Sequence, residues 1–85
     1  MKEKIVEVVG DKLNDLDIWI DEVYSSKEGS INYLHIVLDS KEIMPLSKVV
    51  QATRIISPLL DKIDIMDDKY MLDIYAKSKG DDNYE

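Results

Sequence analysis

The chain has 85 residues, of which 18 are acidic and 11 are basic, and it carries a formal net charge of −7 with no cysteine. This length allows one small domain with one core, and the lack of cysteine excludes disulfides and thiolate metal sites. No apolar run approaches the roughly 20 residues of a membrane span, and because charges are mixed through the apolar N-terminal residues we expect no targeting signal there. We therefore expect a cytoplasmic protein. Its charge favours a basic protein partner over nucleic acid, although solubility alone also explains such a charge.

The first expected element is a helix over residues 2–16. Ile5, Val9 and Leu13 recur at helical spacing on one side, opposite a row of charged side chains. Gly10 costs such a helix about 1 kcal/mol relative to alanine, and packing of the apolar side can offset that cost.

A strand is expected next, over residues 17–24. It is rich in β-branched and aromatic side chains, but its alternation is imperfect, so the sequence does not decide which face is buried. Residues 25–30, SSKEGS, predict the loop that follows, with a length that suits a hairpin connection or a slightly longer excursion.

The second strand, over residues 31–39, alternates well between two sets of side chains. The aliphatic set should face the helices and consists of Leu34, Ile36 and Leu38. The set on the opposite face consists of Tyr33, His35 and Val37.

Residues 46–61 predict the second helix, which has an almost wholly apolar stripe. Pro45 and Ser47 both supply helix-start chemistry, and the sequence does not choose between them. Pro58 removes a backbone donor, so a kink or an early stop is expected there. The stripe consists of Val49, Ala52, Thr53, Ile56, Leu59, Leu60 and Ile63.

A charged turn over residues 61–69 leads to a third strand over residues 70–75, again with clear alternation. The remaining residues have no periodicity. We therefore expect one α/β domain over residues 1–76 and a flexible acidic tail over residues 77–85.

These elements predict an α+β fold of two layers, in which a three-stranded sheet carries two helices on one face, in the order α-β-β-α-β. The other face of the sheet would then lack a partner within the chain. Small sheets often keep a mixed face in water, so the face is either simple surface or a docking site for another domain or protein. The candidate partner-binding residues are Tyr33, His35, Asp39, Asp73 and Tyr75.

The sequence gives little support to catalytic or metal chemistry. His35 is the one histidine, and without a cysteine or second histidine it predicts neither a zinc site nor a nucleophile–base pair, so a plain surface role is expected. The carboxylates of the charged turn lack the spacing of a calcium loop and should be solvated; they are Asp61, Asp64, Asp67 and Asp68. We expect no enzyme, no cofactor and no metal.

Three segments together resemble the N-terminal domain of RimP, the ribosome maturation factor family. LHIVLD at residues 34–39 resembles that family's strand ending in Asp, SPLLD at 57–61 resembles its helix end before an acidic turn, and YMLDI at 70–74 resembles its Y-x-L-E-V strand. The resemblance covers roughly residues 16–80. After the third strand the chain departs from the family's S-S-P-G segment, and the family's second, SH3-like domain has no counterpart in these residues.

The resemblance implies a non-enzymatic factor that binds the small (30S) ribosomal subunit, or a basic ribosomal protein, during assembly. An acidic domain suits that role because carboxylates pair with a basic protein. We expect a monomer without membrane contact and without direct nucleic-acid contact. Two alternatives stay open: a KH-like RNA-binding domain, whose element order is similar but whose Gly-x-x-Gly loop is missing here, and a generic protein-interaction module that uses the open sheet face.

Overall fold

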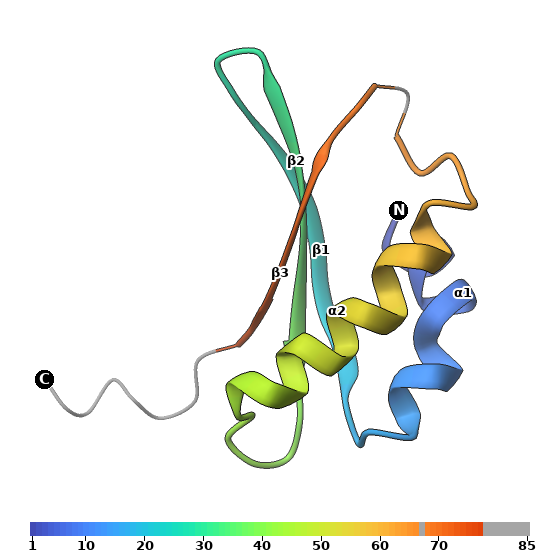
Figure 1. The fold of residues 1–85 in the computed structure, drawn as a ribbon, viewed down its shortest axis with the longest axis vertical. Coiled ribbons are helices and arrows are strands. Elements are labelled where there is room, and N and C mark those ends of the chain that lie inside the picture. The colour runs from blue at the N-terminus through green and yellow to red at the C-terminus, as the bar shows by residue number, and fades with distance from the viewer. Residues whose placement is uncertain (67, 78–85) are drawn as a thin grey trace, which may run out of the picture.

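The computed structural model describes residues 1–66 and 68–77, so the tail expected over 77–85 lies almost wholly outside the described residues. Two helices and three strands follow one another as α1 (Lys2–Asn14), β1 (Trp19–Glu28), β2 (Ile31–Asp39), α2 (Leu46–Leu60) and β3 (Met71–Ala76) (Figure 1). The predicted α+β class and the α-β-β-α-β order are both confirmed.

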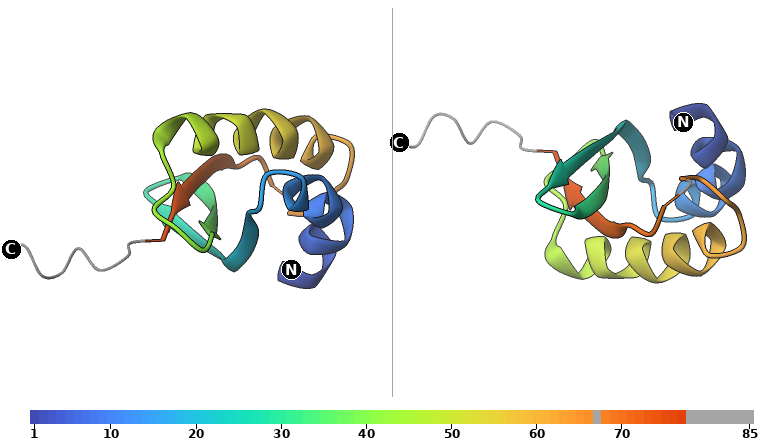
Figure 2. Two further views of the ribbon diagram at one scale, coloured as in Figure 1. Left: turned by 90° about the horizontal axis from the view of Figure 1, so that it is seen from below. Right: turned by 90° about the horizontal axis from the view of Figure 1, so that it is seen from above.

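The sheet has the strand order β1-β2-β3, with β1 antiparallel and β3 parallel to the central strand. Parallel neighbours need a crossover, and α2 supplies it. Viewed along the long axis of the domain, α1 and α2 lie on the same side of the sheet, and the opposite side carries no helix (Figure 2). The sequence left the strand order undecided, and the structure shows that β2 is the central strand.

One core fills the space between the helices and the sheet. α1, β2 and α2 each contribute three fully buried side chains at the spacing of their own secondary structure, four residues apart in the helices and two apart in the strand. The predicted inward face of β2 is therefore confirmed. The buried core consists of Ile5, Val9, Leu13, Ile18, Ile20, Leu34, Ile36, Leu38, Ala52, Ile56 and Leu60.

A β-bulge explains the imperfect alternation of the first strand. The register shifts between Ile20, which pairs with Leu38, and Glu22, which pairs with Val37, so Asp21 is an extra residue in β1. Such an insertion reverses the facing of every later side chain. Ile20 therefore faces the core, and Glu22 faces away from it.

The loop predicted over residues 25–30 is wrong in extent. β1 continues through Ser25 to Glu28, paired with β2 along its whole length, and the turn itself is Gly29 and Ser30. Gly29 has a φ of +61°, which glycine adopts without steric cost. Residues 25–28 are polar because this hairpin arm is exposed to solvent. They nevertheless form a strand, because their backbone is paired with β2, which composition alone does not reveal.

The structure decides where α2 begins and corrects the expected effect of Pro58. Pro45, with an extended ψ of 157°, is the N-cap residue of α2, and the cap has no side-chain hydrogen bond, so Ser47 does not cap the helix. α2 also continues through Pro58 to Leu60, and the early stop was wrong. Pro58 is exposed and lies in the last turn, where it disturbs few backbone hydrogen bonds. Neither of these helices is long and apolar enough to cross a bilayer, which holds for the described part of the chain.

Candidate functional site

The side of the sheet without helices carries a continuous set of polar and aromatic side chains. Alternation along β2 and β3 places there the residues that the sequence predicted, and the bulge in β1 adds three more on the same face. We call this surface the open sheet face. Its central residues are Glu22, Tyr24 and Ser26 of β1, Tyr33, His35 and Val37 of β2, and Met71, Asp73 and Tyr75 of β3.

His35, on the central strand, forms hydrogen bonds through both ring nitrogens. Its Nδ1 donates to Oδ2 of Asp73 on β3 at 2.8 Å, and its Nε2 lies 2.7 Å from Oγ of Ser26 on β1. With the proton on Nδ1 of the neutral ring, Nε2 accepts from the serine hydroxyl. Three strands thus meet at one imidazole, and the prediction of a plain surface histidine is wrong.

Two tyrosine rings stack against the same imidazole. The centroid of Tyr24 lies 4.4 Å from that of His35 with an interplanar angle of 17°, and Tyr33 lies at 5.9 Å and 23°. The stacking leaves the histidine side chain only 15% exposed on a face that is otherwise open. The two hydrogen bonds set the positions of the ring nitrogens, and the two stacks set the plane of the ring, so together they favour this orientation of the imidazole.

The hydroxyls of Tyr24 and Tyr75 meet 2.7 Å apart, and we call these two residues the tyrosine pair. They belong to the outer strands β1 and β3, which lie about 10 Å apart, so the two rings must reach across β2 to meet. Val37 lies on β2 between these strands and is only 5% exposed although it faces away from the core. The tyrosine pair therefore covers the apolar centre of the open sheet face.

The environment of Tyr75 raises the pKa of its phenol to about 12. The hydrogen bond with Tyr24 is the largest cause, followed by burial and by the negative charges of Tyr24, Asp73 and Glu22. Each of these opposes the negative charge of a phenolate. Because Asp73 and Glu22 both raise this pKa, their carboxylates lie close to the tyrosine pair.

The charge of the open sheet face is predominantly negative. The ammonium group of Lys77, which follows β3, lies 3.5 Å from Oδ2 of Asp21 in the bulge. Strand alternation places four further carboxylates of the described residues on this face. The carboxylates are those of Glu22, Glu28, Asp39 and Asp73.

The structure joins four of the five predicted partner-binding residues through the network around His35 and the tyrosine pair. Asp39 differs, since it lies at the end of β2, where its Oδ1 accepts a hydrogen bond from the backbone N–H of Ser40. Sequence reasoning missed Tyr24 and Ser26. The bulge concealed which way Tyr24 points, and Ser26 lay in a predicted loop, so neither could be assigned to this face.

The order hydroxyl, imidazole, carboxylate is that of a Ser-His-Asp triad, an arrangement that the sequence did not predict around His35. Triad chemistry also needs oxyanion donors and a substrate cleft. The backbone of Ser26 is paired with that of Tyr33 in the sheet. The hydrogen-bonded side chains therefore lie on paired strands at an open surface.

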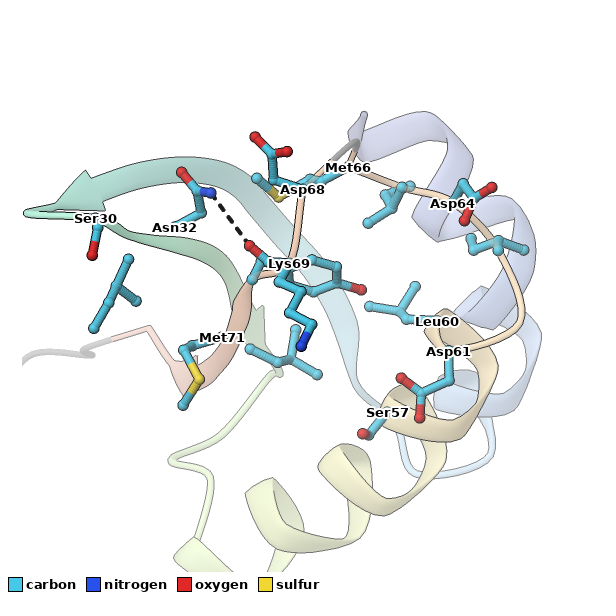
Figure 3. Close-up of a pocket in the computed structure, with 15 residues that line it drawn as sticks. Ser30, Asn32, Ser57, Leu60, Asp61, Asp64, Met66, Asp68, Lys69 and Met71 are labelled. Carbon is cyan, nitrogen blue, oxygen red and sulfur yellow. Dashed lines mark hydrogen bonds between the residues drawn. The ribbon is translucent and has the colours of Figure 1, made fainter.

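Two hollows lie at opposite ends of the domain, and Ser26 borders neither of them. One lies beside the start of β3, where the amide of Asn32 donates to the carbonyl oxygen of Lys69 at 3.3 Å (Figure 3). Three of the four turn carboxylates line it, and Asp67 lies outside the described residues. Within residues 1–66 and 68–77, no group of three histidine, cysteine or acidic side chains could hold a metal ion.

Comparison with known families decides the identity of the domain. Residues 4–76 match the family described as the RimP N-terminal domain, a span that begins inside α1 and ends with the last residue of β3. The chain belongs to the RimP N-terminal domain family. The resemblance found in the sequence is therefore confirmed, and the RimP assignment makes this a ribosome maturation factor domain. A search of curated proteins found no match to the chain.

Proposed function

We propose that this RimP domain binds the small (30S) ribosomal subunit during its assembly, through contact with a basic ribosomal protein at the open sheet face. It acts in the cytoplasm as a monomeric binding factor, without catalysis, cofactor or membrane contact. The observation that carries the proposal is the composition of that face in a domain of this family: a set of stacked rings surrounded by carboxylates.

Electrostatics favours a protein over RNA as the direct contact. A chain with a net charge of −7 repels a phosphate backbone, and the carboxylates of the open sheet face would lie against it. The same carboxylates steer a basic protein toward the face and pair with it on contact. Stacking of bases on the exposed tyrosines would be the basis of an RNA-binding alternative, but such modules combine aromatic rings with basic side chains.

Co-sedimentation with purified 30S particles tests the proposal. The chain should pellet with the particles at low salt and be released as salt rises, because the contact is between opposite charges. Substitution of Glu22→Gln and Asp73→Asn together should reduce the pelleted fraction. The matched control, Glu7→Gln and Asp11→Asn, changes the same charges on exposed positions of α1 and should leave the fraction unchanged. Absence of the chain from the pellet at low salt would contradict the proposed function.

A further inference from the structure

The open sheet face presents two carboxylates at opposite corners of the tyrosine pair. The strand register places two rows of three residues across the sheet: Glu22, Val37 and Tyr75 in one row, and Tyr24, His35 and Asp73 in the next. The hydroxyl contact of the tyrosine pair runs along one diagonal of this rectangle. Glu22 and Asp73 therefore lie at the ends of the other diagonal, one on each side of the joined phenols.

Both carboxylates have unused hydrogen-bonding capacity. Asp73 accepts from His35 through Oδ2, its other oxygen has no partner among the described residues, and its side chain is 49% exposed. Glu22 is exposed and has no hydrogen bond or ion pair with any residue of 1–66 or 68–77. An ionised carboxylate accepts several hydrogen bonds, so each can take a cationic donor without giving up an internal contact.

The rings between these carboxylates supply a second type of contact. Tyr24 and Tyr75 are each 38% exposed, and their faces carry the negative electrostatic potential of an aromatic ring. A cation is attracted to such a face, and a planar guanidinium can stack on it while donating hydrogen bonds in its own plane. An ammonium group cannot do both in the same geometry. The combination therefore fits arginine better than lysine.

We propose that the open sheet face binds arginine side chains of an extended basic protein segment, with guanidinium groups stacked on the tyrosine pair and hydrogen-bonded to Glu22 and Asp73. This inference rests on the proposed function and defines the chemistry of its partner. The hydrogen bond from His35 holds the Asp73 carboxylate in place, so this part of the site is formed before the partner arrives, whereas the Glu22 side chain becomes ordered on binding.

The unfused 85-residue chain is titrated with an acetylated, amidated peptide of alternating glycine and arginine, and with its lysine counterpart. Because the chain has one histidine, the NMR signals of the His35 ring report on the face without ambiguity. The arginine peptide should shift these signals and those of the tyrosine pair. The lysine peptide should bind several-fold more weakly, because it loses the stacked and forked contact.

Charge-matched variants separate a defined site from general attraction. Asp73→Asn and Glu22→Gln should each weaken binding of the arginine peptide about two- to fivefold, which is the range for exposed charge pairs. Asp11→Asn and Glu7→Gln on α1 should have no such effect. Equal weakening by both sets, or equal affinity for the two peptides, would overturn the proposal. A single-stranded uridine oligonucleotide that shifts the same signals at lower concentration would also overturn it, in favour of base stacking.

The outcome is distinguishable from that of the sedimentation assay. If the chain pellets with 30S particles but the arginine peptide leaves the His35 signals unmoved, the proposed function stands and the arginine site is rejected. If the peptide binds as expected but the chain does not pellet, the arginine site stands and its assignment to ribosome assembly fails.

Discussion

Tyr75 is the residue whose protonation the fold alters most clearly. Its pKa rises to about 12, and the hydrogen bond with Tyr24 is the largest cause. Tyr24→Phe removes that bond and should lower the pKa of Tyr75 toward its ordinary value of 10. The absorbance of tyrosinate, followed while the solution is made alkaline, measures the change. Burial and Asp61 also raise the pKa of Tyr70, so the difference between the wild-type and Tyr75→Phe curves is needed to isolate the Tyr75 phenol.

The same shift predicts how stability depends on pH. The folded-state pKa is raised, so the neutral phenol stabilises the fold fully below the unfolded value of 10. This contribution is lost as pH rises from 10 to about 12, where the unfolded chain is ionised and the folded one is not. Tyr75→Phe should flatten that part of the curve of unfolding free energy against pH. An unchanged slope in the variant would show that the hydroxyl contact is not maintained in solution.

Ser26 tests whether the network around His35 has catalytic power. The serine hydroxyl and the imidazole have the spacing of a nucleophile and its base, but Ser26 lies on an open surface outside both described hollows. A fluorophosphonate probe should therefore leave Ser26 unlabelled, and ester hydrolysis should not change in Ser26→Ala. Stoichiometric labelling lost in Ser26→Ala and in His35→Gln would contradict the assignment of a purely orienting role.

Two glycines in different elements should respond in opposite ways to the same substitution. Gly10 lies inside α1, and a Cβ there would meet Cγ1 of Val6 at 3.4 Å, an ordinary contact. Gly10→Ala should stabilise the domain by about 1 kcal/mol through helix propensity. Gly29 has a φ of +61° with nothing within 4 Å of its Cβ position. Gly29→Ala should destabilise by about 1 kcal/mol, because alanine is disfavoured in the left-handed region.

The midpoint of urea unfolding measures both changes. Since neither added methyl group has a steric conflict, the sign of each effect depends on backbone conformation alone. A loss of stability in Gly10→Ala would mean that α1 cannot accommodate the methyl group beside Val6. No change in Gly29→Ala would mean that the hairpin turn adopts another conformation in solution.

The elements that the sequence predicted well are those whose pattern is set by the core. Leu34, Ile36 and Leu38 alternate because one face of β2 is buried, and Ile56 and Leu60 recur because one side of α2 is buried. The hairpin arm of residues 25–28 has no such constraint, since both of its sides meet water. Its strand character comes from hydrogen bonds to β2, which no local pattern records.

The candidate site could be predicted only in part, for a reason that belongs to the whole fold. Alternation along β2 and β3 was enough to place His35, Asp73 and Tyr75 on one face. Their contacts depend on strand order and on the bulge at Asp21, which together bring Tyr24 and Ser26 beside them. Because sequence patterns within one strand contain no information on its neighbours, an isolated histidine could not be distinguished from the centre of a network.

The stability of the whole domain depends on one small core, and a single buried side chain tests this. Ile56 of α2 is fully buried in the core between the helices and the sheet, whereas Ile43 in the segment before α2 is 79% exposed. Ile56→Ala should reduce the free energy of unfolding by about 2–5 kcal/mol, through lost burial and the cavity left behind. A domain of this length has about 4–13 kcal/mol in total, so the variant should be partly unfolded at moderate temperature. Ile43→Ala, measured in the same urea titration, should change stability by less than about 0.5 kcal/mol. Similar losses in the two variants would contradict the placement of the core between the helices and the inner face of the sheet.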